Sequence, residues 1–434
     1  MALGNFVLLH EFAPIYLTID RIGPFQDRLE VFDLSDAQGR SSNYFLIFGF
    51  NGRGKTHVME LMAHMMGILG QNPDAAPPPF GCESLDQGPG RAQLDILLRY
   101  STDTVKSSTA VLSIFAGKAD SEIWLKTWSD TELTEFGADE HHSVGIARDS
   151  LGRYRWNNQN DGWSSGVANS WCRDFIDWIR THQGSSLSGF MNSSFSPPTL
   201  LYFSAYRDVL PIPKEAERAA VSPRDWNYRP LHIFRNEGKE WQESLDNLLV
   251  WLAWLDDGRY EAALELINTY VFRGSGKHLA GIDRQKLCAV IDCASETWLN
   301  KRSVALENQG DERKHRLDQL SSGEKSLLQL FLRIGVHMTA NTILLIDEVD
   351  AHLHVDWQAR IAQRLKELAQ NTPGLSIFLT SHSEEVMKSA AWEYPESGLR
   401  KNGFLIETPE EEERAKRIQD EARAFYSHQD QEGV

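Results

Sequence analysis

The sequence predicts an α/β fold with a mixed sheet, and three observations support this prediction. An apolar run, Tyr44 to Phe48, is followed by a glycine-rich turn and by the helical pattern His57 to Leu69. Two further apolar runs, Thr342 to Ile346 and Ser376 to Ser381, each lie next to helical stretches. The chain has 434 residues, of which 41% are hydrophobic, so it can build two or three domains with a large core. Buried strands that alternate with helices indicate a sheet covered by helices.

The turn after the first apolar run matches a phosphate-binding P-loop at every fixed position. Its residues are Gly49, Phe50, Asn51, Gly52, Arg53, Gly54, Lys55 and Thr56. The glycines allow a tight turn with inward N–H groups, and the start of the next helix adds positive potential. Lys55 is placed to bind the β- and γ-phosphates of a nucleotide, and Thr56 to ligate Mg²⁺. Two interpretations of Arg53 stay open: a further cation near the phosphates, or a solvent-facing side chain.

The second half of the chain contributes three more segments with a chemical role. The segment Leu320-Ser321-Ser322-Gly323-Glu324 precedes a long helical pattern, so its amides are suited to cap a phosphate. Asp347 ends a buried strand and can hold Mg²⁺ together with Thr56. Glu348, beside it, is placed to orient or deprotonate an attacking water. His382 ends the next buried strand, within reach of a γ-phosphate.

In this order and spacing, the four motifs resemble the P-loop NTPase head of ABC-type ATPases. More narrowly, they resemble the SMC and break-repair heads and the related OLD-type ATPases. The run Asp347-Glu348-Val349-Asp350-Ala351-His352-Leu353-His354 is especially similar to the OLD type. The resemblance implies ATP and Mg²⁺ as cofactors and an N-terminal β subdomain. It also implies that the signature, Leu320 to Glu324, acts in trans on a nucleotide bound by a second subunit. The apolar stripe along 241–271 separately predicts a helical lid insertion.

Two features depart from the family pattern. The signature has Ser322 and Glu324 where the common transporter form has glycine and glutamine, which makes a transporter ATPase less favoured. The glutamine that senses Mg²⁺ and the γ-phosphate is not assigned by sequence. Three glutamines are candidates, and one further dipeptide is an alternative: Gln71, Gln87, Gln93, and Tyr206-Arg207.

Charge and cysteine content indicate which partners and which cellular compartment the protein has. The net charge of −17 does not indicate a nucleic-acid partner, because phosphate contacts need clustered Lys and Arg. One stretch is enriched in basic residues, and we favour a solvated face over a nucleic-acid contact there. Its cations are Arg207, Lys214, Arg218, Arg224, Arg229 and Arg235. Four scattered cysteines fit a reducing cytoplasm, and no apolar stretch is long enough to cross a bilayer. For His141-His142 we expect a loop and a structural role.

We expect four parts in the chain. Residues 1–135 carry the P-loop, 136–310 form an insertion with a helical hairpin at 241–271, 311–408 carry the other motifs, and 409–434 form a charged tail. The insertion has no sustained heptads, and the part after His382 is too short for a Toprim nuclease domain. We therefore expect a cytoplasmic ATPase that dimerises on ATP and regulates a separate nuclease or toxin, as in anti-phage defence. The alternatives are a repair ATPase acting on DNA and a nucleotide-gated scaffold with little turnover.

Overall fold

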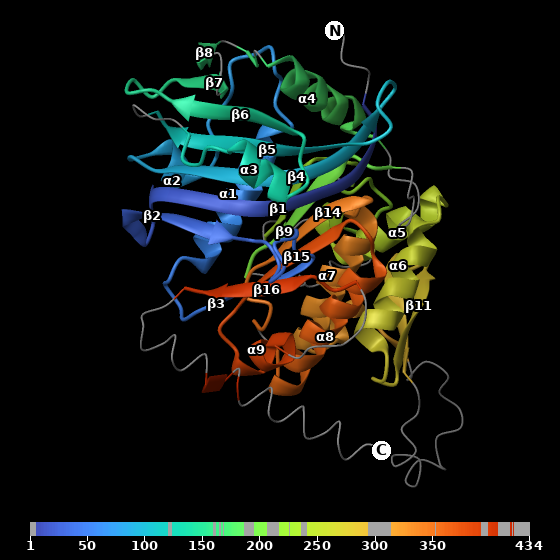
Figure 1. Cartoon of the computed structure of the whole chain (residues 1–434). Coiled ribbons are helices and arrows are strands. Elements are labelled where there is room, and N and C mark those ends of the chain that lie inside the picture. The colour runs from blue at the N-terminus through green and yellow to red at the C-terminus, as the bar shows by residue number, and fades with distance from the viewer. Residues whose placement is uncertain are drawn as a thin grey trace, which may run out of the picture.

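A long antiparallel-rich sheet and a parallel sheet lie next to each other in the computed structural model of the chain, with most helices beside the parallel sheet (Figure 1). The structure describes residues 6–119, 124–158, 162–164, 166–167, 169–185, 195–205, 217–224, 226–235, 241–293, 314–351, 353–391, 398–406, 417–418 and 420. The expected tail 409–434 therefore lies almost wholly outside the described residues, as does His352.

The first sheet has seven strands in the order β2-β1-β4-β5-β6-β7-β8. Neighbouring strands pair antiparallel, except β5 and β6, which pair parallel. The strands are β1 (Phe6–Ile22), β2 (Phe25–Asp33), β4 (Arg91–Thr102), β5 (Ser108–Lys118), β6 (Glu140–Arg148), β7 (Tyr154–Asn158) and β8 (Gly162–Ser164). The sheet thus provides the expected N-terminal β subdomain and continues past residue 135; the domain boundaries themselves stay predictions.

The expected loop at His141-His142 is wrong, because both residues lie in β6. His142 stacks on Trp171 with ring centroids 3.9 Å apart, and its Nε2 lies 2.9 Å from Glu140 Oε2. His141 contacts the hydroxyl of Ser113 through Nε2 at 2.9 Å. Among the described residues, no group of three or more His, Cys, Asp or Glu side chains is arranged to hold a metal ion. Both histidines are therefore packed parts of the sheet.

The second sheet has six strands in the order β10-β9-β14-β15-β3-β16, and all its neighbours pair parallel. The strands are β3 (Tyr44–Phe48), β9 (Pro198–Phe203), β10 (Leu231–Phe234), β14 (Asn341–Ile346), β15 (Leu375–Ser381) and β16 (Lys401–Leu405). Residues of β3 alternate between two cores. Phe45 and Ile47 face the first sheet, whereas Tyr44 and Leu46 face the helices on the other side. A strand buried on both faces reads as a continuous apolar run, which is why the sequence shows it so clearly.

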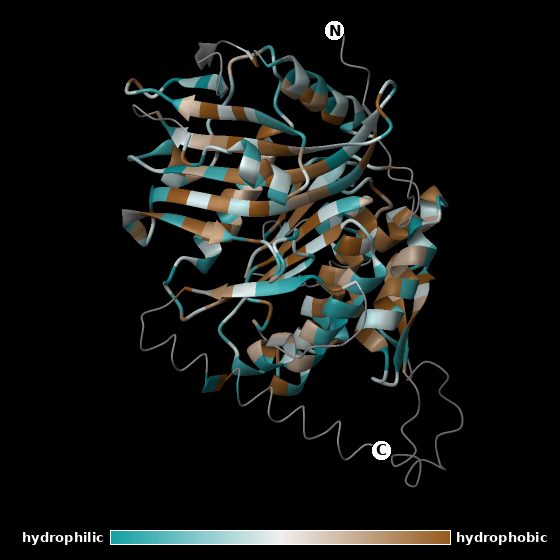
Figure 2. Cartoon of the chain, in the orientation of Figure 1, coloured by the Kyte–Doolittle hydropathy of each residue, from teal (hydrophilic) through white to brown (hydrophobic). Residues whose placement is uncertain are grey.

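Helices cover the two faces of the parallel sheet differently. Helix α1 (Lys55–Ile68) packs between the two sheets, and this position explains its methionine-rich sequence, which is apolar on most sides. The opposite face is covered by α7 (Ser322–His337), α8 (Val355–Asn371) and α9 (Glu384–Ala391). Hydrophobic residues concentrate along the strands and the helices next to this sheet (Figure 2). Short helices α2 (Glu83–Asp86) and α3 (Asp130–Glu135) and helix α4 (Ser170–His182) belong to the N-terminal half.

The expected helical hairpin at 241–271 is present and packs on α7. It consists of α5 (Leu245–Leu255) and α6 (Arg259–Ile267), and the chain reverses between them at Asp256 and Gly258, both with positive φ. Ser244 caps α5 by accepting a hydrogen bond from the N–H of Asn247 at 3.1 Å. A small antiparallel sheet lies beside the hairpin and leads to the signature: β11 (Lys277–Asp283), β12 (Cys288–Cys293) and β13 (Lys314–His315).

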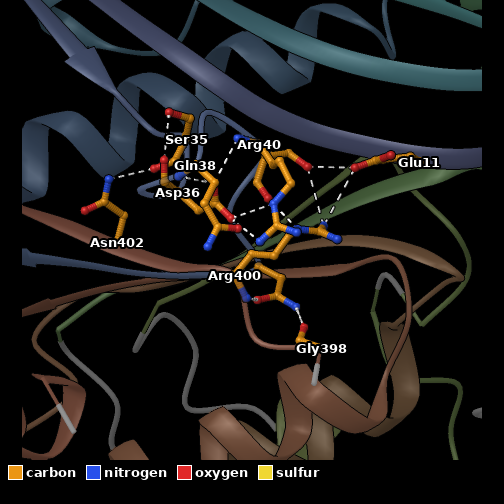
Figure 3. Close-up of polar contacts among 10 residues, drawn as sticks. Glu11, Ser35, Asp36, Gln38, Arg40, Gly398, Arg400 and Asn402 are labelled. Atoms are coloured by element: carbon orange, nitrogen blue, oxygen red, sulfur yellow. Dashed lines mark hydrogen bonds and ion pairs between the residues drawn. The ribbon is translucent and has the colours of Figure 1, made fainter. Parts of the chain in front are cut away.

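A network of polar contacts attaches the last strand to the N-terminal half of the chain (Figure 3). Arg400 Nε donates to the carbonyl oxygen of Ser41 at 2.6 Å, and Ser41 Oγ donates to Glu11 at 2.7 Å. Asn402 Nδ2 donates to the carbonyl oxygen of Ser35 at 2.7 Å. Because β16 pairs with β3, these contacts support the strand that carries the P-loop.

Asp36 shapes the loop that enters β3 (Figure 3). Its carboxylate accepts hydrogen bonds from the N–H groups of Gln38 and Arg40, both at 2.9 Å, and from the Arg40 guanidinium at 2.9 and 2.7 Å. Burial raises the pKa of Asp36, but these hydrogen bonds outweigh the effect of burial, so its pKa lies below the ordinary value. The part of the chain that the structure describes contains no helix long and apolar enough to cross a membrane.

Candidate functional site

The strand order brings three of the predicted motifs to one edge of the parallel sheet. Neighbours run β9-β14-β15-β3, all parallel, so their carboxyl ends share an edge. The P-loop follows β3, the acidic pair follows β14 and His382 follows β15. In sheets of this kind, ligands bind at the carboxyl ends of the strands.

The P-loop has the geometry that its glycines predict. Gly52 and Gly54 have φ of 81° and 100°, values that side chains with a Cβ rarely adopt. At Gly54 a Cβ would also lie 2.6 Å from the ring of Pro24 and 2.9 Å from that of Phe25. The turn between β1 and β2 therefore packs against the last glycine of the loop, directly before the first residue of α1.

Lys55 lies inside the loop. Its side chain is 5% exposed, and its ammonium donates hydrogen bonds to the carbonyl oxygens of Gly49 at 2.5 Å and Phe50 at 2.8 Å. Phe50 and Asn51 are exposed, whereas Arg53 is half-buried. The cation is thus held within the turn whose N–H groups and helix start favour an anion.

The acidic residue after β14 meets the P-loop threonine. Thr56 Oγ1 donates to Asp347 Oδ2 at 2.8 Å, and Asp347 is 1% exposed. Thr380, on β15, donates to the other oxygen of Asp347 at 2.5 Å and accepts the N–H of Glu348 at 2.7 Å. A buried carboxylate beside a threonine hydroxyl is an oxygen donor pair that suits Mg²⁺, so these residues fit the predicted metal site.

Glu348 and His382 flank this centre. Glu348 has φ of 45°, in the left-handed region that non-glycine residues seldom occupy and that is often found at functional sites. His382 is 45% exposed, and its Nδ1 lies 3.2 Å from Oδ2 of Asp350, which is 1% exposed. A carboxylate at Nδ1 favours the tautomer with the proton there and leaves Nε2 for another partner.

The signature begins α7 as a complete capping box. Ser321 Oγ accepts the N–H of Glu324 at 3.3 Å, and the Glu324 carboxylate accepts the N–H of Ser321 at 3.0 Å and its hydroxyl at 2.8 Å. Lys277 donates to the same carboxylate at 2.7 and 2.9 Å. Burial raises the pKa of Glu324, but the Lys277 and Ser321 hydrogen bonds prevail, so its pKa is lowered. Ser321 and Ser322 are exposed, Leu320 is buried and Gly323 is half-buried.

The positions of the candidate glutamines in the fold make two of them less suited to sense a γ-phosphate. Gln93 is fully buried in β4, where it donates to the carbonyl oxygen of Lys126 and accepts the N–H groups of Leu125 and Lys126. Gln71 follows the C-terminal end of α1, opposite to the helix end at the P-loop. The carboxyl end of β9 lies next to Asp347, whose N–H donates to the carbonyl oxygen of Phe203 at 2.9 Å. The alternative Tyr206-Arg207 follows that end, just outside the described residues.

The fold and the site define a P-loop ATPase. The chain belongs to the family described as "AAA domain, putative AbiEii toxin, Type IV TA system", because the sequence model of this family matches residues 45–388. It is also similar to the Retron Ec83 probable ATPase of Escherichia coli, with 33% identity over 21% of this chain. That match spans only 18% of the retron protein. The predicted ATPase activity, ATP binding and kinship with defence-type ATPases are thereby confirmed.

Solved structures give weak similarities. The SMC head domain from Thermotoga maritima matches with 13% identity and a TM-score of 0.34, covering 87% of this chain and 92% of that one. An SMC head bound to the C-terminal winged-helix domain of ScpA matches with 10% identity and a TM-score of 0.37, at the same coverage.

Two residues in this site were not singled out by sequence reasoning. Thr380 restrains Asp347 and Glu348 together, and Asp350 restrains His382. The signal for Asp350 was a third carboxylate two positions after Glu348. The signal for Thr380 was a hydroxyl near the carboxyl end of an otherwise apolar strand.

Proposed function

We propose that this ATPase dimerises on ATP, with the signature of each subunit closing over the nucleotide of the other, and that it regulates a separate effector in antiviral defence. The observation that carries the proposal is the solvent exposure of the signature serines. Ser321 and Ser322 are exposed at the start of α7, and the hydrogen bonds that Ser321 makes among the described residues go to Glu324 and Lys325, within the first turn of the helix. Exposed amides at a helix start are suited to bind a phosphate, and their exposure leaves them accessible to a phosphate held by another subunit.

Each residue of the site then has its own role in ATP binding and hydrolysis. Lys55 and the P-loop N–H groups bind the β- and γ-phosphates, and Thr56 and Asp347 hold Mg²⁺, which neutralises phosphate charge when bound. Glu348 accepts the proton of the attacking water or orients it. His382, fixed through Nδ1 by Asp350, contacts the γ-phosphate through Nε2. Once the γ-phosphate has left, the signature of the partner loses its ligand and the interface reopens.

The proposed biological setting follows from kinship. The family description names a putative toxin of a type IV toxin–antitoxin system, and one similar protein is a probable retron ATPase. A conformational cycle driven by ATP would suit the release or recruitment of a nuclease or toxin on a separate chain. The cytoplasm as location and Mg²⁺ as cofactor are part of the same proposal.

A hydrolysis-blocked variant tests the proposal. We expect Glu348→Gln to bind ATP, lose turnover by at least a hundredfold and accumulate as a dimer in Mg-ATP during light-scattering chromatography. The matched control is Glu348→Gln with Lys55→Ala, which keeps the same surface but should stay monomeric because it lacks ATP binding. Hydrolysis by Glu348→Gln at the wild-type rate would refute Glu348 as the base. A monomer in saturating Mg-ATP would refute the trans signature.

Affinity capture of tagged Glu348→Gln from its native cells in Mg-ATP tests the effector. A nuclease or toxin that co-purifies in Mg-ATP but not with the double variant would support the proposed effector. DNA together with repair proteins would move the assignment to genome maintenance.

A further inference from the structure

A cavity lies beside the edge strand β10. It has a volume of about 430 Å³ and is lined by β10, by the C-terminal end of α7 and by the segment that enters α5. This volume lies within the usual range for small-molecule sites. Because α7 has 16 residues, its C-terminal end lies about 24 Å from the signature at its start. The cavity is therefore separate from the signature end of the helix.

Three aromatic rings and a guanidinium form one wall of this cavity. His232 and Phe234 lie two residues apart on β10, and Arg333 and His337 lie four apart on α7, so each pair shares a face. The His232 and His337 rings are 4.4 Å apart, and Phe234 and His337 are 5.3 Å apart. The Arg333 guanidinium lies 4.8 Å from the centre of the Phe234 ring.

Buried polar atoms in this wall lack partners. His232 is 4% exposed and His337 is 2% exposed, yet Nε2 of the first and Nδ1 of the second make no hydrogen bond to any residue that the structure describes. Nε of Arg333 is also buried without a hydrogen bond, although its Nη2 donates to the carbonyl oxygen of Glu243 at 3.4 Å. Glu243 Oε2, in the same lining, is likewise buried without a hydrogen bond among the described residues. Buried polar groups in native proteins are nearly always paired, so three such nitrogens against one such carboxylate oxygen favour a ligand with acceptor atoms.

The charges around the cavity favour an anion. Four arginines line it, Arg224, Arg229, Arg235 and Arg333, against one carboxylate, Glu243. Arg224 pairs with Glu243 at 3.0 Å, and Arg235 lies 3.6 Å from Glu60 on α1. This excess of positive charge belongs to a chain with a net charge of −17, so it is a local feature and not a consequence of composition.

The pKa values of the side chains in this wall agree with the binding of an anion. Burial lowers the pKa of His232 to about 3, with further lowering by Arg229 and Arg333, and burial lowers the pKa of His337 well below its usual value. Both rings are therefore neutral at pH 7, and each can donate one hydrogen bond. Burial also lowers the pKa of Arg333, to about 10, although the nearby Glu243 acts in the opposite direction.

We propose that this cavity binds a small phosphorylated ligand, with the Arg333 guanidinium and the two imidazoles around the phosphoryl group and the exposed arginines at the rim. Arginine binds phosphate oxygens through two parallel hydrogen bonds, and neutral imidazole N–H groups donate to the remaining oxygens. The same phosphoryl chemistry is present on a free nucleotide and on the 5′ end of a nucleic-acid strand.

Calorimetric titration with inorganic pyrophosphate, without Mg²⁺, tests the cavity. Because the P-loop also binds anions, the reference protein is Lys55→Ala, in which we expect one remaining site. Adding Arg333→Met should weaken this binding at least tenfold, and adding Arg224→Ala, at a 57% exposed side chain, should weaken it severalfold without affecting folding. The matched control is Arg153→Ala, an arginine of similar exposure (58%) in the N-terminal half, which should change nothing.

The proposal is overturned if Lys55→Ala binds no pyrophosphate. It is also overturned if folded Lys55→Ala proteins that carry Arg333→Met and Arg224→Ala bind as tightly as the reference, or if Arg153→Ala weakens binding equally. Competition by AMP and by a 5′-phosphorylated tetranucleotide then identifies the source of the phosphoryl group, since the stronger competitor is the one that the cavity accommodates.

Discussion

Replacing Thr380 by valine should damage both the stability of the protein and its catalysis. The threonine hydroxyl donates to the buried Asp347 carboxylate at 2.5 Å and accepts the N–H of Glu348 at 2.7 Å. A hydrogen bond to a charged group contributes about 1.5–3 kcal/mol, and a buried N–H left unpaired costs about 1–3 kcal/mol. Since valine keeps the shape of threonine, we expect the free energy of unfolding to fall by roughly 3 kcal/mol.

The effect on catalysis follows from the same contacts. Without Thr380, the Asp347 carboxylate loses one of the two threonine hydroxyls that donate to it, and the left-handed turn at Glu348 loses an anchor. We expect kcat to fall at least tenfold and the Mg²⁺ concentration for half-maximal activity to rise, whereas Thr380→Ser should restore both. The assays are urea denaturation and steady-state ATP hydrolysis over a Mg²⁺ series.

Thr342 provides a matched control on the neighbouring strand. It is fully buried, and its hydroxyl accepts the N–H of Thr339 and donates to the carbonyl oxygen of the same residue, both at 2.9 Å. These are neutral hydrogen bonds far from any carboxylate of the site, so Thr342→Val should lose stability but keep kcat. Wild-type kcat in Thr380→Val, or an equal loss of kcat in Thr342→Val, would refute the reasoning.

Three further predictions concern other residues. Asp350→Asn should lower kcat about tenfold with little change in KM, because His382 loses the carboxylate that orients it, whereas Asp356→Asn, at an exposed Asp, should leave kcat unchanged; steady-state kinetics decide. Gly54→Ala should weaken ATP binding more than tenfold in calorimetry, because φ of 100° and the contact with the preceding turn both exclude a Cβ. Burial and then Lys401 lower the pKa of Lys366 to about 7, so the unfolded chain binds more protons above pH 7. The free energy of unfolding should therefore rise from pH 7 to 9, by up to about 1.4 kcal/mol per pH unit, and Lys366→Met should flatten this rise in denaturation curves.

The parallel sheet and its motifs could be predicted because their signals are local. The five residues of β3 are buried on both faces, so the strand is a continuous apolar run that ends at a glycine turn. The same holds for β14 and β15, which deliver Asp347 and His382 to the edge that parallel strands share. Spacing along the chain was enough to place these groups on one side of the sheet.

Contacts between distant segments could not be predicted in this way. The motifs predicted that Thr56 and Asp347, 291 positions apart, act together, but only the strand order shows that Thr380 on β15 also meets Asp347. His141-His142 was expected in a loop, but both residues lie in β6, where the His142 ring stacks on the distant Trp171. The cavity beside β10 brings Arg333 of α7 together with Arg224, Arg229 and Arg235, for which the sequence favoured a solvated face.

The central claim is that each ATP site is completed by the signature of a second subunit, and mixing two inactive variants tests it most directly. Lys55→Ala lacks a working P-loop, and Ser321→Arg lacks a working signature, so each protein alone should be inactive. In an equal mixture, each dimer that combines the two chains has one intact site, made from the P-loop of the Ser321→Arg chain and the signature of the Lys55→Ala chain. We predict that the mixture regains ATP hydrolysis, to about a quarter of the wild-type rate if the chains pair at random and the sites work independently. A mixture as inactive as its components, with both variants folded, would contradict the claim.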